Sequence, residues 1–223
     1  MVELTPRLAA VAGMVEKGSV IADIGTDHAY IPAYLIEKGV IERAFACDIK
    51  IGPLQNAEKT MREHGIGSVD FILCDGLSGV SPESIDTVVI AGMGGEMIAA
   101  ILEQAPWCRD ARYRFVFQPM TKAEVLREYL YRTGFEIQRE TLAAEKDKLY
   151  TVMLVCYTGV SRNISEVLAL LGEARADPLF EEKRRREIKR LKAIYRSLEN
   201  KKDAAEMREK IAALIKEIEV YSC

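Results

Sequence analysis

The chain has 223 residues, which is enough for one large α/β domain and a small appendage. Hydrophobic residues make up 49% and charged residues 29%, the balance of a soluble globular protein. The sequence has no apolar run long enough to span a bilayer and no secretion signal, and its five cysteines include no C-x-x-C pair. We therefore expect a cytoplasmic protein with no membrane partner, no disulfide framework and no bound metal.

Charge is divided unevenly along the chain. Residues 161–223 hold 15 Lys and Arg against 12 Asp and Glu, a net charge of +3. Because the whole chain carries −3, the first 160 residues carry −6. An acidic body with a basic tail suggests a polyanionic partner bound at the tail, although a solvated helical surface is a simpler explanation.

The first predicted element is a short helix after Thr5, the expected N-cap, with Pro6 at the first helical position. Leu8, Val11 and Met14 recur at helical spacing and predict an apolar face toward the rest of the protein. Arg7 in the first turn is a candidate for binding a carboxylate or phosphate, with an ordinary surface arginine as the alternative.

The stretch 20–32 organises the chain. A short apolar strand ends near Asp23, the chain turns at Gly25, and a helix pattern resumes from Ala29 to Glu37. This is the first half of a βαβ unit. In open α/β sheets the ligand lies beyond the carboxyl ends of the strands, where Gly25 lets the backbone pass close to a bound molecule. An ordinary strand-to-helix turn is the alternative.

Further strands end in the same way. The predicted second strand, 43–48, ends in Asp48, the expected acceptor for both hydroxyls of an adenosine ribose. The third ends in Asp75-Gly76 and the fourth in Gly92-Met-Gly-Gly95. Since parallel strands place their carboxyl ends at one edge, these residues predict a shared crevice.

A fifth strand over 113–119 contains Gln118, and Thr121 is the expected cap of a helix that runs to Arg132. Two more strands, 135–140 and 148–157, have no helix between them and predict an antiparallel hairpin. The predicted fold is therefore α/β, with the seven-stranded, Rossmann-like sheet of class I methyltransferases. We place a domain boundary between residues 158 and 159.

Beyond that boundary the strand pattern disappears. Two heptad seams predict an antiparallel coiled-coil hairpin with a polar turn at 199–203. The seam residues are Ile188, Leu191, Tyr195 and Leu198, then Met207, Ile211, Leu214, Ile218 and Tyr221. Basic residues crowd the first helix, among them Arg184, Arg185 and Arg186.

Two cofactors compete for the first turn. NAD requires G-x-G-x-x-G, but Gly25, Asp27 and Tyr30 occupy the three glycine places. A carboxylate at Asp27 would repel a pyrophosphate and suit a cationic sulfonium or an amino group. The turn also departs from the usual methyltransferase pattern, in which the middle position is commonly glycine. We therefore favour S-adenosylmethionine over NAD.

The strings Asp-Ile-Gly-Thr-Asp-His-Ala-Tyr-Ile-Pro, Ala-Gly-Met-Gly-Gly and Phe-Gln-Pro-Met resemble those of the bacterial TrmK-type tRNA (adenine(22)-N1)-methyltransferases. The resemblance covers nearly the whole chain and implies methyl transfer from S-adenosyl-L-methionine to N1 of adenine 22 in tRNA. It implies a cofactor site made of the residues Asp23, Gly25, Asp27, His28, Asp48, Asp75, Gly76 and Gly92. Arg7 and Ile49 are further candidates for this site.

The reaction needs few side chains, because the methyl donor is activated and adenine N1 carries a free lone pair. The candidate catalytic residues are Asp27 and His28. Asp27 would stabilise the positive charge that develops on the base. Two alternative roles for Asp27 are contact with the cofactor and capping of the turn. The N/D-P-P-Y/F loop of amino methyltransferases is absent. The candidate substrate-binding residues are Met93, Gly94, Gly95, Gln118, Arg184, Arg185 and Arg186.

Two other classes stay open. One is a methyltransferase that acts on another RNA, a protein or a small molecule, with the helical tail serving for dimerisation. The other is a non-catalytic RNA-binding module that keeps a nucleoside pocket. No obligate protein partner is evident, and we expect a monomer or a weak dimer.

Overall fold

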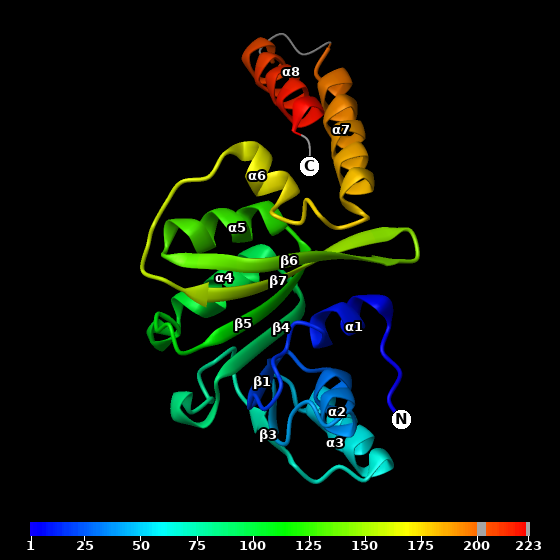
Figure 1. Ribbon diagram of the computed structural model, residues 1–223, viewed down its shortest axis with the longest axis vertical. Coiled ribbons are helices and arrows are strands. Elements are labelled where there is room, and N and C mark those ends of the chain that lie inside the picture. Colours follow the sequence, from blue (N-terminus) through cyan, green and yellow to red (C-terminus); the bar gives the residue numbers. More distant parts are fainter. Residues whose placement is uncertain (200–203, 222–223) are drawn as a thin grey trace.

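The computed structural model describes residues 1–199 and 204–221, and its centre is a seven-stranded sheet with helices on both faces (Figure 1). The strand order is β3-β2-β1-β4-β5-β7-β6, and only β7 runs antiparallel to its neighbours. The predicted seven strands and antiparallel finish are confirmed. The strands are β1 (Ile21–Ile24), β2 (Ala44–Asp48), β3 (Val69–Leu73), β4 (Thr87–Gly94), β5 (Arg114–Thr121), β6 (Phe135–Glu145) and β7 (Lys148–Tyr157).

Helices cover both faces of the sheet because the central strands are apolar on both sides. One core joins the sheet to α4 and α5, and the other joins it to α1, α2 and α3. No helix in 1–199 or 204–221 is both long and apolar enough to cross a membrane. The helices are α1 (Pro6–Ala12), α2 (Tyr30–Glu37), α3 (Ile51–His64), α4 (Gly95–Glu103), α5 (Ala123–Arg132), α6 (Glu166–Leu171), α7 (Phe180–Ser197) and α8 (Ala205–Val220), with 3-10 turns η1 (Pro82–Ser84) and η2 (Pro106–Cys108).

The fourth strand ends within the predicted Gly92-Met-Gly-Gly95 segment, because β4 continues through irregular pairing with β5 as far as Gly94. One local prediction near this sheet edge is wrong. Thr121 does not cap α5: it is the last residue of β5, and Lys122 takes the cap position with a left-handed backbone (φ 58°). The Lys122 carbonyl oxygen lies 2.1 Å from where a Cβ at Gly95 would be. Residue 95 must therefore be glycine for the two backbone segments to pass this closely.

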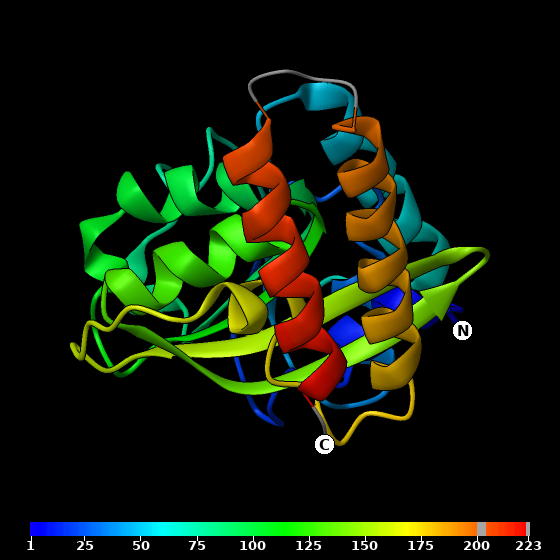
Figure 2. The same cartoon turned by 90° about the horizontal axis from the view of Figure 1, so that it is seen from above.

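The C-terminal part forms a third packed cluster on β6. Helices α7 and α8 lie side by side across the β6–β7 hairpin (Figure 2), and α6, which the sequence patterns did not predict, packs beneath them. Leu191, Ile211, Leu214 and Ile218 of the predicted seams are buried, whereas Met207 is 55% exposed. The predicted turn falls largely on residues 200–203, which lie outside the described residues.

Buried charges join this part to the sheet. Arg127 on α5 and Glu140 on β6 have fully buried side chains and lie 2.5 Å apart. Arg127 also donates to the Ala169 carbonyl of α6 at 2.6 Å, and Lys183 of α7 lies 3.6 Å from Glu140. Four elements, α5, β6, α6 and α7, therefore meet at one cluster of charged groups, and each charged partner is costly to remove.

Candidate active site

The first turn is built as the glycine pattern predicts. Gly25 has φ +74°, and the backbone N–H groups of Gly25 and Thr26 both donate to the Cys47 carbonyl of β2, at 2.8 and 3.0 Å. A Cβ at residue 25 would lie 2.2 Å from the Met93 methyl carbon. The group that lies this close to Gly25 is the Met93 side chain of β4.

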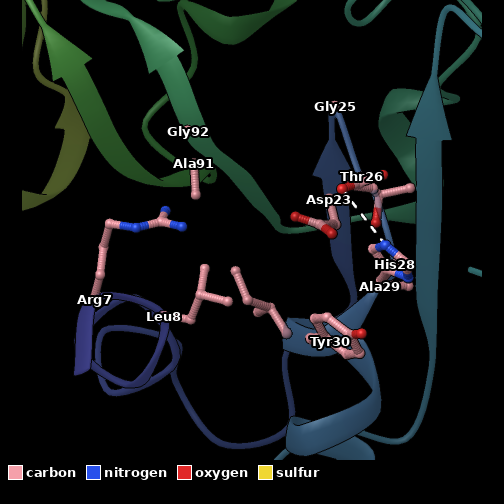
Figure 3. A pocket seen from close by; sticks show the side chains of 12 residues that line it. Arg7, Leu8, Asp23, Gly25, Thr26, His28, Ala29, Tyr30, Ala91 and Gly92 are labelled. Carbon is pink, nitrogen blue, oxygen red and sulfur yellow. Dashed lines mark ion pairs between the residues drawn. The ribbon is translucent and has the colours of Figure 1, made fainter. Parts of the chain in front are cut away.

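A cavity of about 340 Å³ opens beside this turn, between α1, the start of α2 and the end of β4 (Figure 3). Its volume is in the range of small-molecule sites. The turn fixes one wall because its backbone is tied to β2, and Pro6 and the Thr5 cap fix α1 opposite it. The lining residues are Arg7, Leu8, Asp23, Gly25, Thr26, Asp27, His28, Ala29, Tyr30, Ile31, Ala91 and Gly92.

Two opposite charges face this cavity. Figure 3 shows the Arg7 guanidinium reaching in from α1 and the Asp23 carboxylate from β1 on the other side. Asp23 is only 6% exposed, and burial raises its pKa to about 6. A ligand that carries both an ammonium and a carboxylate group would satisfy both side chains. The amino-acid end of S-adenosylmethionine has this pair of groups.

The candidate catalytic residues lie at the rim of the cavity. The side chain of Asp27 is 74% exposed, and its Oδ2 is 3.6 Å from His28 Nε2. His28 in turn stacks on the Tyr30 ring, with centroids 5.0 Å apart and planes within 4°. These three side chains form a polar and aromatic rim where a planar substrate could lie.

Asp48, Ile49, Asp75 and Gly76 lie outside the enclosed cavity, at the ends of the next two strands. The Cys74 N–H donates to the Asp48 carbonyl at 3.0 Å, which holds the ends of β2 and β3 together. Asp48 Oδ1 accepts a hydrogen bond from the Lys50 N–H at 2.7 Å, and no partner within the described ranges is seen for Oδ2. Ile49 is 60% exposed and its neighbour Leu73 is 58% exposed. These two apolar side chains offer a surface for a flat ring such as adenine.

The predicted substrate residues divide into two groups. Met93 lies half-buried over Gly25, and Gly94 lies beside the Thr121 hydroxyl. Gly95 is buried against Lys122, so position 95 requires glycine because of packing. Gln118 is fully buried, accepts a hydrogen bond from Arg7 and does not line the cavity.

The three arginines of α7 have partners within the chain. Arg184 pairs with Glu181 and donates to the Glu219 carbonyl of α8 at 2.9 Å. Arg186 pairs with Glu182 and donates to the Asp147 carbonyl at the β6–β7 turn at 2.7 Å. Arg185 donates to the Glu181 carbonyl at 3.3 Å and forms no ion pair among the residues described. Arg184 and Arg186 therefore also attach α7 to its neighbours.

The sequence patterns missed several residues of the cavity wall. Tyr30 left a signal, because it occupies the third glycine place of the G-x-G-x-x-G pattern at the start of the helix. Ala91 directly precedes the predicted strand end at Gly92. Leu8 left none: it reads as an ordinary core position of α1.

Comparison with known proteins identifies the fold and the family. The profile of a family described as "Methyltransferase domain" matches residues 4–153, about two thirds of the chain. The chain belongs to this methyltransferase family. Its predicted resemblance to TrmK is confirmed by relatives that match over nearly the full length of both chains.

Three relatives illustrate this match. The tRNA (adenine(22)-N(1))-methyltransferase of Bacillus subtilis is 29% identical over 98% of this chain and 95% of its own length. The crystal structure of Streptococcus pneumoniae Sp1610 in complex with S-adenosyl-L-methionine is 30% identical, with a TM-score of 0.83 over 97% of this chain and 98% of that one. The structure of M. capricolum TrmK in complex with S-adenosyl-homocysteine is 29% identical, with a TM-score of 0.81 over 97% of this chain and 98% of that one.

Proposed function

We propose that this chain transfers a methyl group from S-adenosyl-L-methionine to N1 of adenine 22 in tRNA, in the cytosol. The observation that carries the proposal is the pair of opposite charges, Arg7 and Asp23, facing one cavity at the carboxyl ends of β1 and β4. Relatives of full length named for this reaction support the choice of substrate.

The proposed cofactor site has two halves. Asp23 takes the ammonium group and Arg7 the carboxylate of the amino-acid end. Asp48 accepts the ribose hydroxyls, Asp75 accepts from the adenine amine, and Ile49 and Leu73 provide apolar contact. Gly25, Gly76 and Gly92 allow the backbone to lie close to the ligand, and each has a positive φ in this structure.

Catalysis by the chain is mainly a matter of positioning. S-adenosylmethionine supplies an activated methyl group when bound. In a folded tRNA, N1 is engaged in pairing or stacking, so the adenine must turn out of its helix to reach the site. The rim formed by Asp27, His28 and Tyr30 orients the base. The methylated base is cationic, and the Asp27 carboxylate favours that charge once the substrate excludes water from it.

We further propose that residues 1–158 form the methyltransferase domain and that 159–223 form a tRNA-binding unit with an antiparallel coiled-coil hairpin. Cross-helix contacts support the hairpin: Lys192 pairs with Glu219 at 2.9 Å, and Leu191 is buried opposite Ile211 and Leu214 in one cluster. Arg185, Lys189 and Arg196 are exposed at helical spacing along one side of α7. They are the side chains best placed for phosphate contacts.

Primer extension on a methylated tRNA transcript tests the function directly, because a methyl group on adenine N1 blocks pairing and stops the polymerase. The expected result is one stop at position 22 that requires both protein and S-adenosylmethionine. A transcript with guanine at position 22 is the matched control and should give no stop. Methylation elsewhere, or none on any tRNA, would contradict the proposal.

A further inference from the structure

Gln118 at the end of β5 is a polar side chain buried completely beside the cavity that it does not line. Its Oε1 accepts from Arg7 Nη1 at 2.7 Å, and its Nε2 donates to the Pro119 carbonyl at 2.9 Å. Because a guanidinium only donates and a carbonyl only accepts, these two contacts determine which way the amide points. The buried amide of Gln118 is therefore oriented with its oxygen toward Arg7.

Arg7 is held at several points, and its guanidinium forms no ion pair with a carboxylate of residues 1–199 and 204–221. Its backbone N–H donates to Glu145 at 3.3 Å, and its Cζ lies 5.6 Å from the centroid of the Tyr150 ring. Figure 3 shows its tip directed into the cavity, opposite Asp23. A long side chain fixed in this way is ready to receive an anionic ligand group without further ordering.

We propose that Gln118 is a positioning residue for ligand specificity: it orients Arg7 so that the cavity selects molecules with an α-carboxylate over the nucleoside portion alone. The inference rests on the proposed function, since it takes the ligand to be S-adenosylmethionine or its product. Gln118 acts through Arg7 and does not touch the ligand.

Two compounds separate this role from a general effect on the site. S-adenosylhomocysteine carries the amino-acid end that would meet Arg7. 5′-Methylthioadenosine has the same adenosine and sulfur but neither the carboxylate nor the ammonium group. Only the first compound depends on the orientation of Arg7.

Isothermal calorimetry with both compounds tests the proposal. Gln118→Met keeps the length of the side chain and removes the acceptor for Arg7. It should raise the Kd of S-adenosylhomocysteine about tenfold, the scale of one hydrogen bond to a charged group, and change that of 5′-methylthioadenosine less than about twofold. Gln55→Met, on the exposed side of α3, is the matched control and should change neither.

A second measurement asks whether Gln118 acts through Arg7. In an Arg7→Met background, adding Gln118→Met should change the affinity for S-adenosylhomocysteine less than about twofold, because no guanidinium remains to be oriented. The full tenfold loss in that background would overturn the proposal. So would equal weakening of both compounds by Gln118→Met, or no weakening of either.

Gln118→Glu covers the case in which Gln118→Met does not fold, since it retains an acceptor for Arg7. The added carboxylate would pair with the guanidinium and should weaken S-adenosylhomocysteine selectively. Unchanged affinity in this variant would count against the proposal. A wild-type protein that binds neither compound would overturn the proposed function, and this inference with it. If wild type binds both S-adenosylhomocysteine and 5′-methylthioadenosine, the results for the variants decide only the role of Gln118, and the proposed function is unaffected.

Discussion

Asp23→Asn should make the free protein more stable and the bound complex weaker. Asp23 is a carboxylate held at 6% exposure in the wall of a cavity, and burial raises its pKa from 3.8 to about 6. At neutral pH the folded protein must therefore keep a buried negative charge. We infer that this cost is retained because a cationic ligand group binds there.

The magnitude follows from the pKa difference. A carboxyl group that goes from 3.8 to about 6 on folding costs about 3 kcal/mol once it is ionised in both states. The folded state keeps the proton between about pH 4 and 6 while the unfolded state releases it, so this group lowers stability as pH rises through that window. Asparagine removes the charge but leaves a buried amide to satisfy, which costs about 1 kcal/mol. We expect a net gain of about 1–2 kcal/mol at pH 7.5 and none at pH 4.

Urea unfolding of wild type and Asp23→Asn across pH 4 to 8 measures this gain. The difference between the two proteins isolates Asp23, because carboxylates with lowered pKa values, such as Glu145 and Asp177, are common to both. Asp147→Asn, at an exposed position of the β6–β7 turn, is the matched control and should stay within about 0.5 kcal/mol of wild type. The reasoning would be refuted if the difference in unfolding free energy between Asp23→Asn and wild type did not change with pH. It would also be refuted if Asp23→Asn lost stability relative to wild type as the pH rose from 4 to 7.5.

Three further substitutions test other parts of the site and fold. Asp48→Ala should weaken S-adenosylmethionine binding by about 1–3 kcal/mol with unfolding unchanged, and unaltered affinity in calorimetry would remove Asp48 from the site. Asp27→Asn should lower turnover on tRNA more than it weakens cofactor binding; equal losses would mean a binding role only. Arg127→Met should destabilise the chain by about 3–5 kcal/mol in urea unfolding, because it leaves the buried Glu140 with Lys183 as its one charged partner among the described residues, beside the Glu173 N–H. A loss under about 1 kcal/mol would contradict this.

The parts of the fold that sequence predicts well are those set by local pattern. Short apolar runs between glycines give the strands, and the Thr5-Pro6 start gives α1. The same logic places Gly25, Asp48 and Asp75 at one edge, because parallel strands align their carboxyl ends. Such features depend on residues close together in the chain.

Contacts between distant segments are what sequence could not provide. Gln118 faces Arg7 from 111 positions away, and nothing in either local pattern indicates the pair. Thr121 looks like a helix cap, but β5 extends through it because β4 continues beside it as far as Gly94. Arg184 and Arg186 look like solvated charges until the β6–β7 turn and α8 approach them.

The same long-range contacts decide how tRNA binding by the tail should be tested. Removing the chain after Thr158 would take away the Ala169 carbonyl that Arg127 uses and the Lys183 beside Glu140, leaving buried charges open to water. Loss of activity in that truncation would not separate RNA binding from unfolding.

Substitution of the exposed side of α7 avoids this difficulty. Arg185 and Lys189 are exposed one helical turn apart and form no ion pair among the described residues, whereas Arg184 and Arg186 pair with Glu181 and Glu182. Changing Arg185 and Lys189 together to Gln should reduce the slope of log affinity for tRNA against log salt by up to about two, since each phosphate contact contributes about 0.9. The matched change of Arg184 and Arg186 to Gln should alter that slope less, because neighbouring carboxylates already offset their charge, and should instead lower the midpoint of unfolding. If the paired arginines set the salt dependence and the exposed pair had no effect, the tRNA would lie on another face of the tail.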